Sequence, residues 1–175
     1  MTPLKNALEW LLEWATIILM IGLTVIVVVA VVARLLGESF SWYDEVAAIG
    51  LAWVTYYGAS LAALKRRHIG FDSVLLALPK GLRLGVALVG EAIVLAFFAL
   101  MAWAGMRVLE VLEGDTLVSL DWVPVQLTQS VIPIGAALFI VCQLVSMPDY
   151  LRAVRAGISL EHPEVEDMDM KGRGA

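Results

Sequence analysis

The 175-residue chain contains one cysteine and two histidines, and this scarcity excludes several kinds of site. A single cysteine, Cys142, can form neither an intrachain disulfide nor a Cys-x-x-Cys redox centre. The histidines, His68 and His162, lie outside the long apolar stretches, which argues against a haem held inside a helical membrane bundle. Metal-ligand spacings, Ser/His/Asp sets and glycine-rich phosphate loops are also missing from the sequence. We therefore expect no enzyme, no cofactor bound by this chain and no nucleic-acid partner.

Charge is nearly absent from four long stretches. Residues 15–33, 46–64 and 122–147 contain no Asp, Glu, Lys or Arg, and residues 84–106 contain only Glu91. About 20 apolar residues cross a hydrocarbon core of about 30 Å as a helix, and lipid offers no partners for any other backbone conformation. The pattern predicts an all-α membrane protein with four transmembrane helices, at about 10–34, 45–65, 84–108 and 123–148.

The basic residues are distributed unevenly among the connections. All except Arg34 and Arg107 lie before the first stretch, between the second and third, or after the fourth. The positive-inside rule therefore predicts a multi-pass protein with both termini in the cytoplasm. A cleaved signal peptide is the alternative for the first stretch, but its apolar run is too long, and Glu9 and Glu13 dilute its positive flank.

The connection between the second and third stretches predicts a short interfacial helix at about 72–79. Asp72 or Ser73 is a suitable N-cap, residues 74–78 are apolar, and Pro79 follows. The flanking basic residues are candidate contacts to lipid headgroups: Lys65, Arg66, Arg67, Lys80 and Arg83. An ordinary polar loop is the alternative. Residues 1–160 should form the transmembrane domain, and the acidic tail 161–175 should be disordered.

Glu91 is the one carboxylate well inside an apolar stretch. An acidic residue at the centre of a membrane helix costs roughly 2.5–3.5 kcal/mol to insert, so such a residue usually has a partner or a function. Two roles remain open for Glu91, a titrating coupling site and a structural contact.

In the fourth stretch, Pro133 cannot donate to the carbonyl of Gln129, which predicts a kink beside Gln126, Gln129 and Ser130. Hydrogen bonds from these polar side chains to neighbouring helices are favoured over a polar path.

Small residues recur three or four positions apart in the second stretch, and such stripes let helix backbones approach closely. The stripe and the tryptophans beside it are candidate contacts to another subunit: Trp42, Ala48, Ala52, Trp53, Thr55, Gly58, Ala59 and Ala63. The third stretch has a similar stripe of small residues, at Gly85, Ala92, Ala96 and Ala99. Packing inside the chain's own bundle is an equally good explanation.

Residues 34–72 carry an ordered set of short motifs. An arginine ends the first stretch, Trp-x-x-Glu opens the second, Trp and Gly-Ala lie within it, a basic cluster with His-Ile-x-x-Asp follows, and Pro-Ile-Gly lies in the fourth. The positions are Arg34, Trp42, Glu45, Trp53, Gly58, Ala59, Arg66, Arg67, His68, Ile69, Asp72 and residues 133–135. Their order and spacing resemble the small, DctQ-type membrane subunit of tripartite ATP-independent periplasmic (TRAP) transporters over nearly the whole chain.

The resemblance implies a scaffold. In that family a large permease subunit holds the substrate and sodium sites and moves as an elevator, and a periplasmic substrate-binding protein delivers an organic acid. Sodium is therefore expected on the partner subunit, and membrane lipids are further expected partners. The resemblance also implies that the protein lies in the bacterial inner membrane. The sequence leaves the substrate open among dicarboxylates, sugar acids including sialic acid, and sulfonates.

Two specific roles follow as hypotheses. Arg34 and Glu45 are a candidate ion pair at the outer membrane boundary, with two solvated charges as the alternative. Acidic residues of the outward connections are candidates for docking the binding protein: Glu38, Asp44, Glu110, Glu113 and Asp115. Outside this family, a proton-coupled homodimeric exporter that uses Glu91 and a membrane assembly protein unrelated to transport remain alternatives.

Overall fold

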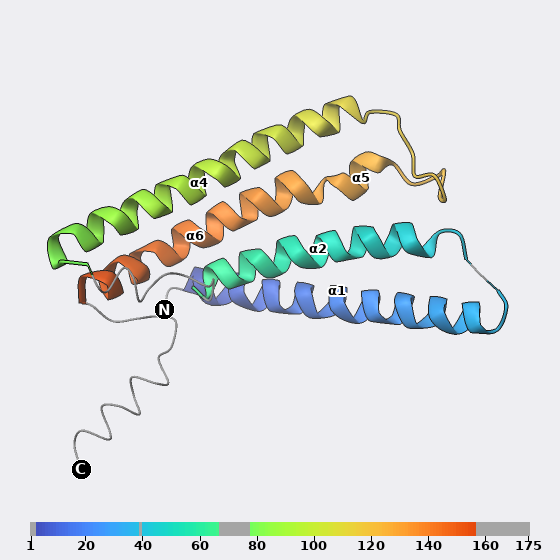
Figure 1. Ribbon diagram of the computed structural model, residues 1–175, viewed down its shortest axis with the longest axis horizontal. Helices are drawn as coiled ribbons and strands as arrows, with labels where there is room; N and C mark the ends of the chain where they lie inside the picture. Colours follow the sequence, from blue (N-terminus) through green and yellow to red (C-terminus); the bar gives the residue numbers. More distant parts are fainter. Residues whose placement is uncertain (1–2, 39, 67–77, 157–175) are drawn as a thin grey trace, which may run out of the picture.

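The computed structural model describes residues 3–38, 40–66 and 78–156. Its helices are α1 (Pro3–Leu35), α2 (Tyr43–Leu64), α4 (Lys80–Val111), α5 (Val125–Gln129) and α6 (Val131–Ala156), shown in Figure 1. Four segments are long and apolar enough to cross a membrane: Pro3–Leu35, Tyr43–Leu64, Gly81–Val111 and Val125–Ala156. This confirms the predicted all-α class with four potential membrane spans. The predicted interfacial helix, except for its last two residues, and the acidic tail lie outside the described residues.

The four long helices pack in a row. α1 packs against α2, α2 against α6, and α6 against α4, so α1 and α4 lie on opposite flanks (Figure 1). The fourth span, Val125–Ala156, is the best covered, with 44% of its most apolar part buried, against 6% for α1 and 11% for each of the other two spans. Each flanking helix therefore leaves most of its circumference for lipid or for another protein.

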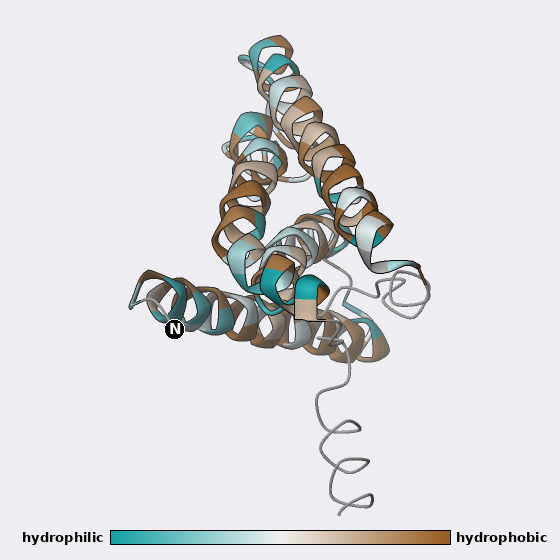
Figure 2. Ribbon diagram, turned by 90° about the vertical axis from the view of Figure 1, so that its left-hand side faces the viewer, coloured by the Kyte–Doolittle hydropathy of each residue, from teal (hydrophilic) through white to brown (hydrophobic). Residues whose placement is uncertain are grey.

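The uncovered faces are strongly apolar. Ile93, Leu100 and Trp103 of α4 are each at least 60% exposed, and valines and isoleucines line the exposed faces of α1. Figure 2 shows that hydrophobic residues make up much of the length of the long helices. Exposed apolar surface of this extent is stable in a bilayer, where contact with lipid costs nothing, but not in water.

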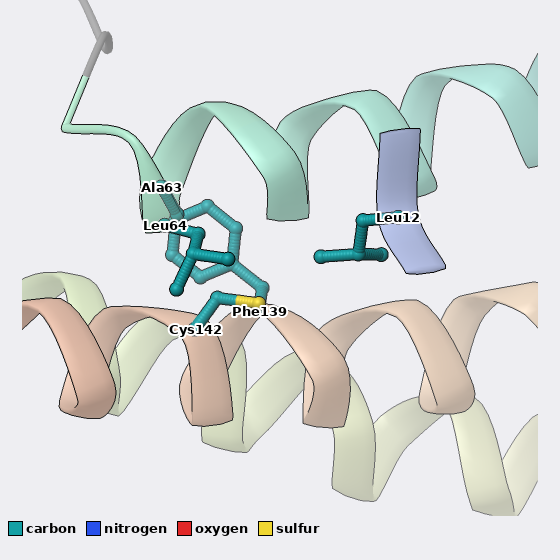
Figure 3. Close-up of a cluster of buried hydrophobic side chains, with 5 residues drawn as sticks. All are labelled: Leu12, Ala63, Leu64, Phe139 and Cys142. Carbon is teal, nitrogen blue, oxygen red and sulfur yellow. The ribbon is translucent and has the colours of Figure 1, made fainter. Parts of the chain in front are cut away.

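The apolar core joins three of the four long helices. Leu12 of α1, Ala63 and Leu64 of α2, and Phe139 and Cys142 of α6 are buried together (Figure 3). The ring of Phe139 also stacks on that of Phe98 in α4, with centroids 3.7 Å apart, so α4 packs against the same core. α6 is thus the helix that packs against both α2 and α4.

Two helices extend further than the sequence predicted. α1 begins at Pro3, where the missing N–H of proline costs nothing because the first turn of a helix has no acceptors for it. α6 continues through Pro148 to Ala156. Proline removes one backbone bond there, but Val154 in the following turn is buried beside Ala87 of α4, and this packing stabilises the extension.

The fourth span is interrupted at Ser130. α5 ends at Gln129 and α6 begins at Val131, so the interruption falls where Pro133 predicts a kink. Ser130 still bridges the two helices, because its N–H donates to the carbonyl of Gln126 at 2.9 Å and its carbonyl accepts from Ile134 at 3.1 Å. Pro133 occupies the first turn of α6, which tolerates proline.

Two glycines mark the closest approaches of α6 to its neighbours. A Cβ added at Gly135 would lie 2.7 Å from the Cβ of Tyr56 in α2. On α4, a Cβ added at Gly105 would lie 2.9 Å from the Cδ of Pro133. Larger residues at either position would push the helices apart.

Replacing Gly135 by alanine should therefore destabilise the chain by about 1–3 kcal/mol, the usual cost of overpacking a filled interface. The matched control is Gly90→Ala, because a Cβ at Gly90 meets nothing within 4 Å and alanine favours the helix. Unfolding of both variants in mixed micelles by a denaturing detergent measures the difference. Equal midpoints for the two variants would contradict the close contact.

Candidate functional site

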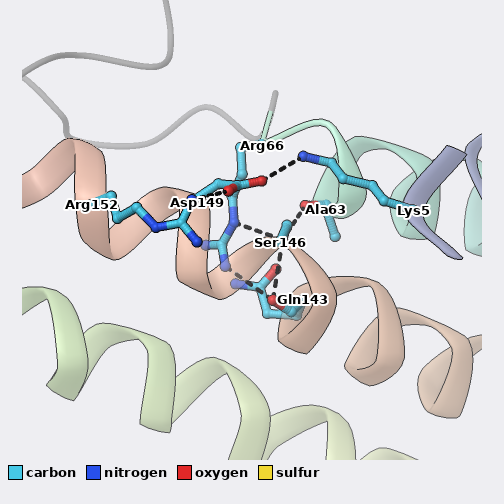
Figure 4. Close-up of polar contacts among 7 residues, drawn as sticks. All are labelled: Lys5, Ala63, Arg66, Gln143, Ser146, Asp149 and Arg152. Carbon is cyan, nitrogen blue, oxygen red and sulfur yellow. Dashed lines mark hydrogen bonds and ion pairs between the residues drawn. The ribbon is translucent and has the colours of Figure 1, made fainter. Parts of the chain in front are cut away.

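A polar cluster lies buried between α2, α4 and α6, at the end of the bundle where α1 begins (Figure 4). We call this the Arg66 end and the opposite end the Glu45 end. The cluster contains Arg66, just after α2, Glu91 of α4, and Gln143 and Ser146 of α6. Glu91 and Gln143 are 6% and 7% exposed, and Ser146 is fully buried. Polar groups buried this deeply usually bind one another, and all the side chains of this cluster do so, although Oε1 of Gln143 has no hydrogen-bond partner among the described residues.

The guanidinium of Arg66 is the centre of the cluster. Its Nη1 forms an ion pair with Oε1 of Glu91, and its Nη2 lies 3.5 Å from Oε2 of the same carboxylate. Its Nε donates to Oγ of Ser146 at 2.8 Å, and Nη2 donates to the carbonyl of Gln143 at 3.1 Å. Cζ lies 4.5 Å from the centroid of the Tyr150 ring, a cation–π contact. The positive charge is thus surrounded by acceptors and an aromatic face.

The carboxylate of Glu91 is equally well occupied. Besides the ion pair with Arg66, its Oε2 accepts a hydrogen bond of 2.8 Å from Nε2 of Gln143. Oγ of Ser146 lies 3.1 Å from the carbonyl oxygens of both Ala63 and Gln143, so its single proton is donated to one of them. The cluster therefore connects α2 to α4 across α6.

The backbone of Arg66 turns its side chain into the bundle. Its φ is +53°, the left-handed region, which costs a non-glycine residue about 1–2 kcal/mol. The N–H of Arg66 donates to the carbonyl of Ala63 at 3.2 Å, and that of Lys65 to the carbonyl of Leu61 at 3.0 Å. This turn ends α2, and the contacts of the guanidinium offset the cost of the conformation.

Ion pairs near the surface attach α1 to the same end. Lys65 pairs with Glu13 and, at 3.2 Å, with Glu9. Lys5 lies 3.0 Å from Asp149 of α6 (Figure 4). Pairs as exposed as these contribute at most about 1 kcal/mol each. The hydrogen bond to Glu13 raises the pKa of Lys65 above its ordinary 10.5, so its stabilising contribution is complete at neutral pH and is lost only in strong alkali.

The structure revises the expected headgroup contacts. Arg66 points into the bundle and Lys65 points toward α1, so both side chains form ion pairs with other helices of this chain. Arg83 is half-buried, and its Nη2 donates to the carbonyl of Leu78 at 3.3 Å. Arg67 and the side chain of Lys80 lie outside the described part of the chain. The charge pattern correctly marks this end as basic, but it cannot distinguish an arginine in headgroups from one that neutralises a buried carboxylate.

At the other end, Glu45 contacts the connection between α4 and α5. Its Oε1 accepts from the N–H of Val118 at 3.2 Å, and its Oε2 accepts from the N–H of Ser119 at 2.9 Å. The expected ion pair between Arg34 and Glu45 is not found among the described residues, where Arg34 is exposed. A carboxylate that faces two adjacent backbone N–H groups is satisfied without a cation.

The candidate docking residues lie in or beside the two connections at the Glu45 end, Asp44 in the first turn of α2 and Glu110 in the last turn of α4. Figure 1 shows both connections at this end. All five are exposed, namely Glu38, Asp44, Glu110, Glu113 and Asp115. Glu110 also forms a 2.8 Å ion pair with Arg107, which reduces the negative charge that it offers to a partner.

The stripe of small residues on α2 divides between two faces. Ala63 is buried in the chain's own core, Ala59 packs against that core, and Nε1 of Trp53 donates to the carbonyl of Thr128 at 3.2 Å. Ala48 and Thr55 are exposed, and the remaining members, Trp42, Ala52 and Gly58, are half-buried. The stripe thus serves internal packing over part of its length.

Gln143, Ser146 and Tyr150 were missed in the sequence analysis. A signal was present, since Gln143 and Ser146 lie three residues apart in an otherwise apolar helix and therefore share a face. Among the described residues no group of three His, Cys, Asp or Glu side chains could hold a metal ion. The arrangement fixes helices in place, and its carboxylate is already bound to a cation.

Four helices of membrane-spanning length, three of them joined by a buried polar cluster, define a multi-pass helical membrane protein. Residues 23–153 match the family model described as tripartite ATP-independent periplasmic transporters, DctQ component. The match covers most of the chain, which therefore belongs to the DctQ family and is the small subunit of a TRAP transporter. Such a transporter also includes a large permease and a periplasmic binding protein. A search of curated proteins finds no match.

Proposed function

We propose that this small subunit braces the large permease and takes no part in substrate binding or ion coupling. The observation that carries the proposal is the state of Glu91, which is bound to Arg66 and Gln143 and is 6% exposed. A coupling carboxylate must exchange its proton or ion during each cycle, whereas this one would first have to leave a buried guanidinium. Reconstitution with and without the permease tests the proposal.

The arrangement of the helices supports a bracing role. The bundle is fastened at the Arg66 end by the buried cluster, and at the Glu45 end by hydrogen bonds from α2 to the α4–α5 connection and to α5. Between the two ends, α1 and α4 keep broad apolar faces. A row of helices held at both ends is a stiff wall against which a mobile partner can move.

The rest of the transport cycle is assigned to the partners. In this proposal the permease moves as an elevator and carries sodium and an organic acid, while this chain binds no cofactor. The Glu45 end faces the periplasm, and both termini lie in the cytoplasm, as the basic Arg66 end suggests. Labelling of Val118→Cys in intact spheroplasts by an impermeant thiol reagent tests this orientation, and protection of that thiol would reverse it.

The acidic residues of the Glu45 end are proposed to attract the binding protein. Neutralising Asp44, Glu113 and Asp115 together should raise the concentration of binding protein needed for half-maximal uptake by roughly tenfold at low salt, because steering by surface charge is electrostatic. The effect should shrink at about 1 M salt, where the screening length is about 3 Å. Glu9→Gln, at the opposite end, is the control. If the triple variant needs the same concentration of binding protein for half-maximal uptake as the parent, these residues take no part in docking.

A further inference from the structure

The connection between α4 and α5 is folded into a small hairpin. Thr116 and Pro124 form a β-bridge, and the N–H of Leu117 donates to the carbonyl of Val123 at 3.0 Å. Below the bridge, the N–H of Val125 donates to the carbonyl of Asp115 at 2.9 Å. We call residues 118–122 the hairpin tip. Two of its members, Val118 and Trp122, are 96% and 77% exposed.

The tip is attached to α2 through one carboxylate. The two N–H groups at the start of the tip, those of Val118 and Ser119, both donate to Glu45, one to each oxygen. Hydrogen bonds to a charged acceptor are roughly twice as strong as neutral ones, and two of them fix direction as well as distance. Glu45 lies in the first turn of α2, where a negative charge also interacts favourably with the helix dipole.

Two hydrogen bonds hold α5, which follows the tip, in place. Nε2 of Gln126 donates to the carbonyl of Leu109 in α4 at 2.8 Å, and Nε1 of Trp53 donates to the carbonyl of Thr128. These bonds secure the base of the hairpin to the bundle. Glu45 contacts the tip itself, above this base.

We propose that Glu45 is a positioning residue, which holds the hairpin tip in the orientation that the periplasmic binding protein meets when it docks. The inference rests on the proposed docking at the Glu45 end. It assigns to Glu45 a function different from that of its neighbour Asp44, which is exposed and has no hydrogen bond to the hairpin among the described residues. The charge of Asp44 acts through space, whereas Glu45 acts through the geometry of the tip.

A spin label on Val118→Cys measures the geometry directly. Cys142 is the single native cysteine and is buried, so the introduced thiol is the one exposed site of this chain. Glu45→Ala should increase the mobility of the label, Glu45→Gln should do so less because one acceptor oxygen remains, and Asp44→Asn should leave it unchanged. Equal mobility in Glu45→Ala and the parent would overturn the inference.

Uptake by the reconstituted three-component transporter supplies the functional measurement. Glu45→Ala should raise the concentration of binding protein for half-maximal uptake by about tenfold, the equivalent of about 1.4 kcal/mol, with the maximal rate unchanged. This effect should persist at about 1 M salt, where that of Asp44→Asn disappears. A Glu45→Ala effect that vanishes with salt would show that Glu45 acts only as a charge and would overturn positioning. If every change at this end leaves docking intact, the proposed docking function fails instead.

Discussion

Replacing Glu91 by leucine should lower the free energy of unfolding by about 3–5 kcal/mol, because Arg66 would remain buried without its counterion. Its cation would keep the contacts to Ser146, Gln143 and Tyr150, but none of these carries the opposite charge. Arg66→Met should cost a similar amount, since the carboxylate would then be buried without a cation and with only the hydrogen bond from Gln143. Unfolding by a denaturing detergent, monitored by tryptophan fluorescence, measures both.

The double variant Arg66→Met/Glu91→Leu gives the sharper result. Removing both charges removes both desolvation penalties, so the double variant should lie within about 1–2 kcal/mol of the parent, far from the sum of the single changes. The matched control on the same helix is Glu110→Gln, which breaks an ion pair with Arg107 whose side chains are more than 60% exposed. That change should cost less than about 1 kcal/mol. Additive effects of the Arg66 and Glu91 changes would contradict a coupled buried pair.

In proteoliposomes, this subunit without the large permease should show no uptake of organic acid, while the permease, this subunit and the binding protein together should be active. Leaving this subunit out should reduce uptake to background, because the moving permease would lose its brace. Radiolabelled substrate with an imposed sodium gradient measures uptake, and liposomes without protein provide the baseline.

Glu91→Gln separates the scaffold from the exporter. The amide keeps an acceptor for Arg66 and removes the titrating group, so a scaffold should retain the sodium dependence of uptake and lose only stability. A proton-coupled exporter would instead be active as the isolated chain and would lose proton-driven transport in this variant. Activity of the chain alone would therefore reject the bracing function. Equal transport by the permease and the binding protein without this subunit would also reject it.

The number and approximate location of the membrane helices follow from the sequence because lipid imposes a local rule. A charge-free run such as residues 15–33 must be helical wherever the rest of the chain lies. Pro133 likewise predicts the interruption at Ser130, since a missing N–H affects only its own helix. The end of α6 was not predictable in this way, because the turns beyond Pro148 are stabilised by Val154 packing on another helix.

The partners of the polar residues were decided only by the tertiary structure. The sequence identified Glu91 as costly and Arg66 as basic, but nothing in their separation along the chain indicates that α6 brings them together. Glu45 was expected to pair with Arg34, and the fold instead offers it the N–H groups of Val118 and Ser119. Burial in lipid acts on each segment separately and can be read from composition, whereas an ion pair or hydrogen bond depends on which segments meet, and that is fixed by the packing of the whole chain.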